Sequence, residues 1–208
     1  MNNRKRMRKD KDGVIFPVAP KLSEMSDSYL KFIEEIKKEI QNQRISVVLN
    51  ANSSMICLYW NIGKAILQKQ EEEGWGAKVI DRMAKDLKDA FPDMSGFSPR
   101  NIKYLRKFAE CWPDFEIVQQ VVAQIPWRTN RMLLDKLDTQ EERIWYAHKT
   151  IENGWSSTIL DLQIQSKLIE RTGKSVNNFP AALPPADSDM ANQIFKDPYL
   201  FDFLGTDM

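Results

Sequence analysis

A long stretch of helical periodicity, residues 26–73, constrains the fold of this chain more than any other feature. Its apolar side chains recur at three- and four-residue intervals, which places them along one face of a helix. Ser26 or Asp27 supplies a plausible N-cap, and Gly74 and Gly76 end the segment. The sequence therefore predicts a mainly α protein built as a helical bundle.

Two asparagines, Asn50 and Asn52, interrupt this stripe. They are compatible with a kink, with a break into two helices, or with hydrogen bonds to another helix, and the sequence leaves these three interpretations open. Periodicity and capping residues predict the following further helical segments: 77–91, 98–112, 114–123 (helical or mixed), 139–153 and 156–171.

The composition agrees with a helical globular domain and excludes several classes of function. The chain has 208 residues, 42% of them hydrophobic, and only 8 glycines, which are few for the turns of an all-β fold. Two cysteines and one histidine cannot supply the four ligands of a structural zinc site, so we expect neither a metal nor a cofactor. His148 lies in a helical stretch, where a packing or surface role is expected rather than catalysis.

The number of cysteines and the hydropathy also indicate where in the cell the protein is found. So few cysteines favour a reducing compartment, and no apolar run approaches the roughly 20 residues of a membrane span. The basic N-terminus, Arg4 to Lys11, is not followed by the apolar segment of a secretory signal. We therefore predict a cytoplasmic protein with no membrane partner, and residues 1–25 as a basic disordered arm.

The helix expected after Ser98 carries the main candidate for a function. Ser98 can cap it, Pro99 suits its first position, and its cations fall opposite an apolar face. A helix, a glycine-containing turn and a capped basic helix are typical of a helix-turn-helix unit, here residues 77–112, whose second helix enters the DNA major groove. The alternative is a plain solvated cationic face. The candidate DNA-binding residues are Ser98, Arg100, Asn101, Lys103, Tyr104, Arg106 and Lys107, with Arg128 and Arg131 as weaker candidates for backbone contact.

Several longer stretches of the sequence resemble the N-terminal domain of the YhcG-type proteins, a domain of unknown function. In that family the domain precedes a PD-(D/E)xK nuclease domain. The resemblance implies a helical, winged-helix-like domain that binds DNA, and it extends from about residue 30 to residue 205. The matching stretches are Leu58–Gly63, Gly96–Ile102, Ala123–Trp127, Trp145–Ser156 and Phe195–Gly205.

The same resemblance implies that the nuclease domain is missing from this chain. Residues 194–208 look like the entry to that domain, after a linker at 173–193 that follows the helical domain at 26–172. The aromatic segment from Tyr199 to Leu204 is then expected to be exposed, because nothing follows that could bury it. Pro-Asp and acid-x-Lys pairs occur in the wrong order and in helix patterns, so we interpret them as chance matches and expect no catalytic residue.

Two functions follow from these observations. The first is a DNA-binding module, itself non-catalytic, of a YhcG-type nuclease. The second is a protein–protein docking or dimerisation module that recruits a nuclease domain, a second copy or another partner. No small-molecule substrate is indicated. Binding to phosphates weakens steeply with salt whereas binding to an apolar surface does not, so the response to salt separates the two.

Overall fold

A computed structural model describes residues 7–9, 11, 13, 15–17, 27–172 and 187–205. The chain divides into two compact units, residues 1–44 and 45–208, and each is described by itself. In the first unit, strands β1 (Met7–Lys9) and β2 (Ile15–Pro17) pair antiparallel, with Arg8 opposite Phe16. This part of the basic arm is therefore paired backbone, contrary to the expected disorder. Lys11 and Gly13 lie between the two strands, and the remaining residues of the arm lie outside the described ranges.

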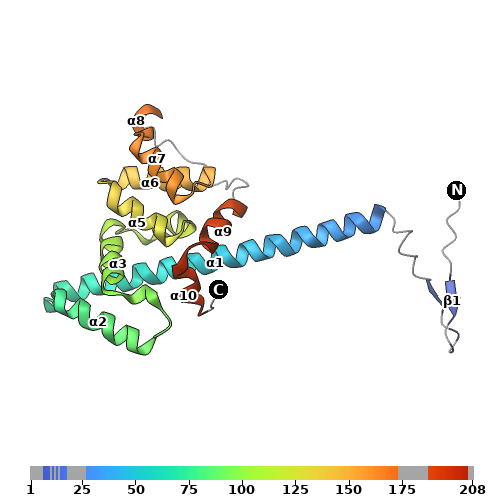
Figure 1. Cartoon of the computed structure of the whole chain (residues 1–208), viewed down its shortest axis with the longest axis horizontal. Coiled ribbons are helices and arrows are strands. Elements are labelled where there is room, and N and C mark those ends of the chain that lie inside the picture. The colour runs from blue at the N-terminus through green and yellow to red at the C-terminus, as the bar shows by residue number, and fades with distance from the viewer. Residues whose placement is uncertain are drawn as a thin grey trace. The chain divides into compact units, whose positions relative to one another are not determined.

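The described part of the chain is mainly helical, as predicted (Figure 1). No helix within the described ranges is both long enough and apolar enough to span a membrane. The helical elements are α1 (Asp27–Glu73), α2 (Ala77–Ala90), the 3-10 turn η2 (Ser95–Phe97), α3 (Pro99–Cys111), α4 (Phe115–Gln120), the 3-10 turn η3 (Val122–Gln124), α5 (Trp127–Lys136), α6 (Gln140–Asn153), α7 (Ser157–Gln165), α8 (Leu168–Thr172), α9 (Asp187–Phe195) and α10 (Pro198–Leu204).

Helix α1 continues through the two asparagines without a break. Asn52 is fully buried, and its side-chain amide donates to the carbonyls of Ala123 (2.8 Å) and Ile125 (3.1 Å). These carbonyls belong to η3 and the residue that ends it. Of the three interpretations that the sequence left open, the hydrogen bond to another segment is correct for Asn52, and it satisfies two buried carbonyls. Asn50 instead donates within α1, to the Ser46 hydroxyl at 3.4 Å.

The core of the second unit is built where the later helices pack around α1 and α3. Helix α2 packs against α3, α3 against α5, and α5 against both α6 and α7, while α8 contacts α6 and α7. The largest buried side chains are aromatic: the ring of Trp127 meets Tyr59 and Phe108 edge-on, with centroids 5.0 and 5.2 Å away. The described residues of this unit contain no strand, so the wing expected of a winged-helix domain is not found there.

The C-terminal helices α9 and α10 belong to this core. Ile194 and Leu200 are at most 1% exposed and lie in the same apolar cluster as Met55 and Trp127. The expectation that Tyr199 to Leu204 would lie exposed was therefore wrong for Leu200, which the helical domain buries, whereas Leu204 is 48% exposed. The expected linker also ends earlier: α9 begins at Asp187, and residues 173–186 lie outside the described ranges.

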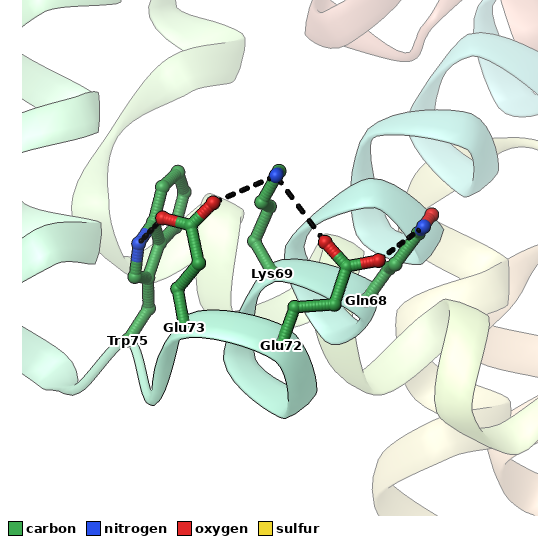
Figure 2. Close-up of polar contacts among 5 residues, drawn as sticks. All are labelled: Gln68, Lys69, Glu72, Glu73 and Trp75. Carbon is green, nitrogen blue, oxygen red and sulfur yellow. Dashed lines mark hydrogen bonds and ion pairs between the residues drawn. The ribbon is translucent and has the colours of Figure 1, made fainter.

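A network of polar side chains surrounds the end of α1 (Figure 2). The Lys69 ammonium lies 2.7 Å from a Glu73 carboxylate oxygen and 3.3 Å from one of Glu72. Glu73 also accepts a 2.8 Å hydrogen bond from the Trp75 indole. The hydrogen bond from Lys69 and then that from Trp75 lower the pKa of Glu73. Two acids at a helix C-terminus oppose the helix dipole, and Lys69 offsets that repulsion before the chain turns at Gly74, whose φ is +66°.

The contact between α1 and α3 requires a glycine at position 63. A Cβ built on Gly63 would lie 2.0 Å from the Leu105 carbonyl oxygen, a backbone atom of α3. Gly63→Ala is therefore expected to lower the free energy of unfolding by about 1–3 kcal/mol, since overpacking outweighs the higher helix propensity of alanine. Urea denaturation measures the change.

Gly76→Ala is the matched control for this substitution. A Cβ at Gly76 meets nothing within 4 Å, so its effect should stay within about 1 kcal/mol, the scale of an altered N-cap. Equal effects of the two substitutions would contradict the close approach of α1 and α3.

Candidate nucleic-acid interface

Helix α3 begins as the sequence predicts. Ser98 is its N-cap, with the hydroxyl accepting from the Asn101 amide at 3.3 Å, and Pro99 is its first residue. The four side chains expected on its inner face, Ile102, Leu105, Phe108 and Ala109, are all buried. The opposite face of α3 is consequently the one that meets solvent.

Asn101 does not lie on that outer face. It is 1% exposed, its amide donates to the Gly96 carbonyl at 2.6 Å, and its side-chain oxygen accepts from the Trp127 indole at 2.8 Å. The expected contact between Asn101 and DNA was wrong, because both polar ends of the side chain hold the turn before α3 and the start of α5 in place. Losing either partner would leave a buried polar group unsatisfied.

Arg100 and Lys103 occupy the outer face of the first turns of α3. Both residues are exposed, and neither has an acidic or other polar side-chain partner among the described residues. A cation that makes no internal ion pair keeps its full attraction for an external anion. Of the candidates on α3, these two are the most available to a phosphate.

Tyr104 and Lys107 share an internal acidic partner on α5. The Tyr104 hydroxyl donates to one oxygen of Asp135 at 2.7 Å, and the Lys107 ammonium lies 3.2 Å from the other. The Lys107 side chain is 40% exposed, so the pair is well solvated and weak. Asp135 thus partly neutralises the outer face of α3, which the sequence gave no reason to expect.

Arg106 points to the side of α3 rather than to its outer face. Its guanidinium donates to the Gln70 side-chain oxygen at 3.4 Å, near the end of α1, and lies 3.8 Å from the Glu110 carboxylate. Arg106 is half-buried. These contacts give it a packing role between α1 and α3.

Arg131, on α5, is held between two tyrosines. Its guanidinium carbon lies 4.3 Å from the centroid of the Tyr104 ring and 5.9 Å from that of Tyr199, and it donates to the Tyr199 hydroxyl at 2.8 Å. Arginine stacks well on aromatic faces. Arg131 therefore joins α3, α5 and α10, which leaves it less available to a phosphate than the sequence suggested.

Asp197 binds the N-terminus of α5 to the C-terminal segment. It is 2% exposed, and its two oxygens accept from the backbone amides of Arg128 (3.0 Å) and Tyr199 (3.1 Å). A carboxylate placed at helix N-termini satisfies amides that have no partner within the helix. Burial nevertheless raises the pKa of Asp197, and these hydrogen bonds only partly oppose the rise. The Arg128 side chain remains exposed.

A groove of about 470 Å³ borders the start of α3. Lys85 and Lys88 of α2 line one wall, and Ser98 and Pro99 line another. Both lysines are exposed, and no ion pair joins either of them to another described residue. Sequence reasoning missed them because lysines on an amphipathic helix are common, and only the packing of α2 on α3 brings them to the start of the basic helix.

Among the described residues, no group of three or more His, Cys, Asp and Glu side chains could hold a metal ion. His148 is half-buried, and burial lowers its pKa. The acid-x-Lys pairs, Glu35 with Lys37 and Asp86 with Lys88, lie within α1 and α2.

Comparison with known families gives one result. The model of the DUF1016 N-terminal domain matches residues 35–171. The chain belongs to this family. The match confirms the resemblance to YhcG-type proteins, and it covers α3 and most of the core of this DUF1016 N-terminal domain. No curated protein and no solved structure is significantly similar to the chain.

The raised pKa of Asp197 predicts a pH dependence of stability. In the unfolded chain this carboxyl titrates near pH 3.9, so the folded state binds its proton more tightly. The stabilisation that comes from this tighter proton binding is complete below that pH, and it is lost as the pH rises through the pKa of Asp197 in the folded state. Urea denaturation should show the free-energy difference between wild type and Asp197→Asn falling as pH rises from about 4. A pH-independent difference would contradict the raised pKa.

Proposed function

We propose that this DUF1016 N-terminal domain binds DNA through the outer face of α3. The observation that carries the proposal is the pair Arg100 and Lys103, both exposed and without an acidic partner among the described residues, on the first turns of a capped helix. Two cations so placed can contact successive phosphates, and the helix N-terminus adds to the positive potential.

The neighbouring groove supports the same interpretation. Lys85 and Lys88 bring two more cations to the edge where α3 begins, and Asp81 and Asp93 line the same groove. In a helix-turn-helix protein the first helix crosses the DNA backbone while the second enters the major groove. We assign phosphate contacts to Lys85 and Lys88 as well as to Arg100 and Lys103.

The connection from α2 to α3 departs from the common form of that motif. It runs from Phe91 to Ser98 and contains the turn η2, whereas a helix-turn-helix usually has about three to four residues there. The proposal therefore rests on the surface of α3 and not on the motif.

The proposal has three further parts: the module is non-catalytic, it acts in the cytoplasm, and it works beside a nuclease domain of the YhcG type.

The double substitution Arg100→Ala/Lys103→Ala tests the proposal. We expect the affinity for a DNA duplex to fall by about tenfold or more. We also expect the slope of log K against log salt concentration to decrease by about two, one for each phosphate contact. Fluorescence anisotropy of a labelled duplex at several salt concentrations measures both quantities.

Lys64→Ala/Arg171→Ala is the matched control, since it removes the same charges from exposed positions on α1 and α8. It should leave affinity within about twofold. No binding by the wild-type chain, or equal losses in the two double variants, would overturn the proposal.

Asp135→Asn is expected to strengthen DNA binding. It removes the negative charge that faces Lys107 and Tyr104, so the affinity for the same duplex should rise by about two- to fivefold at low salt. Glu116→Gln makes the same charge change at an exposed residue of α4 and should have little effect. Unchanged or weaker binding by Asp135→Asn would exclude Lys107 from the interface.

A further inference from the structure

The part of α1 in the first unit, residues 27–44, exposes large apolar side chains to solvent. Leu30, Phe32 and Ile40 are each 55–56% exposed, and Tyr29 and Ile36 are 45% and 39% exposed. Scattered single residues of this kind are ordinary, but five within twelve positions of one helix form a contiguous surface. Such a surface on a helix needs a partner.

Part of this surface has the spacing of a coiled coil. Tyr29, Ile36 and Ile40, together with the half-buried Ile33 and the polar Gln43, follow one another at alternating intervals of four and three residues, which is the a/d pattern of heptads. Ile33 and Ile40 occupy a positions, and Tyr29, Ile36 and Gln43 occupy d positions. In the sequence, Val47 is the next residue with a-position spacing.

The rest of the segment is polar where a coiled coil meets water. The b, c and f positions between Lys31 and Asn42 all carry charged or amide side chains, and all of them are exposed. They are Lys31, Glu34, Glu35, Lys38, Gln41 and Asn42. The polar and apolar side chains therefore lie on opposite sides of the helix, as in an amphipathic helix that packs against one partner.

The positions that flank the seam identify the partner. Glu39 is at a g position, and Arg44 is at the e position of the following heptad. In a parallel pair of identical helices, each g residue faces the e residue of the next heptad on the partner. Glu39 of each copy would therefore meet Arg44 of the other, which gives two opposite-charge pairs. Arg44 has no ion-pair partner among the described residues.

We propose that residues 29–44 form a parallel two-stranded coiled coil with the same segment of a second copy of this chain. Ile33 and Ile40 are the β-branched a residues of two-stranded coiled coils, and of the d positions only Ile36 carries the isoleucine that favours higher oligomers. An antiparallel pair would instead bring e positions together, and these include both Lys37 and Arg44, which repel one another. The lone polar seam residue, Gln43, favours the register in which it meets its own copy.

Leu30 at e and Phe32 at g widen the apolar seam at its N-terminal end.

The proposed DNA-binding residues of α3 take no part in this pairing. The proposal therefore stands on residues 29–44 alone, and its test uses no DNA.

Sedimentation equilibrium of the full chain over a range of concentrations tests the pairing. We expect a reversible wild-type dimer. Glu39→Arg and Arg44→Glu each turn two attractions into two repulsions, so each variant alone should dimerise at least about tenfold more weakly. A one-to-one mixture of the two variants restores both attractions in a parallel pair and should recover wild-type dimerisation.

Glu35→Arg is the matched control, because it makes the same charge change at a c position that faces solvent. It should leave dimerisation unchanged. Circular dichroism of each variant checks that the helices remain folded. A wild-type chain that stays monomeric at every concentration overturns the proposal. So does a dimer that is indifferent to the two charge reversals, or a mixture that fails to recover it.

Discussion

The close approach of α1 and α3 at Gly63 is the contact on which the rest of the second unit depends. A helix can lie against the backbone of another only where no side chain intervenes, and at Gly63 the space for a Cβ is filled by the Leu105 carbonyl. The contact fixes the rotation of α3, and therefore which of its side chains are buried and which meet solvent. The Trp60 indole, which donates to the Trp112 carbonyl at 2.6 Å, holds the far end of α3 to the same helix.

Much of this arrangement follows from local sequence. The two ends of α1, the Ser98 cap, the inner face of α3 and the left-handed Gly154 that ends α6 are all set by neighbours within a few residues, and periodicity and capping rules predict them. Helix α5 was missed because it is short and follows Pro126. Its position depends on distant partners, which no local pattern reveals.

The candidate site was predicted less well than the fold, for a related reason. A helical wheel separates inward from outward residues, but it cannot show what a neighbouring helix places beside them. Lys107 faces an acid on α5 and Arg131 lies between two rings, so both cations already have partners within the chain. Arg100 and Lys103 remain available because no acid of another element reaches them in the described part of the chain.

The buried carboxylate of Asp197 has a consequence for where this folding unit ends. The family match stops at residue 171, yet Asp197 satisfies an amide at the start of α5, and Ile194 and Leu200 fill the core beside it. A recombinant fragment cut at the family boundary would lose that acceptor and leave a cavity lined by apolar side chains. The smallest fragment that retains this core therefore extends to the end of α10.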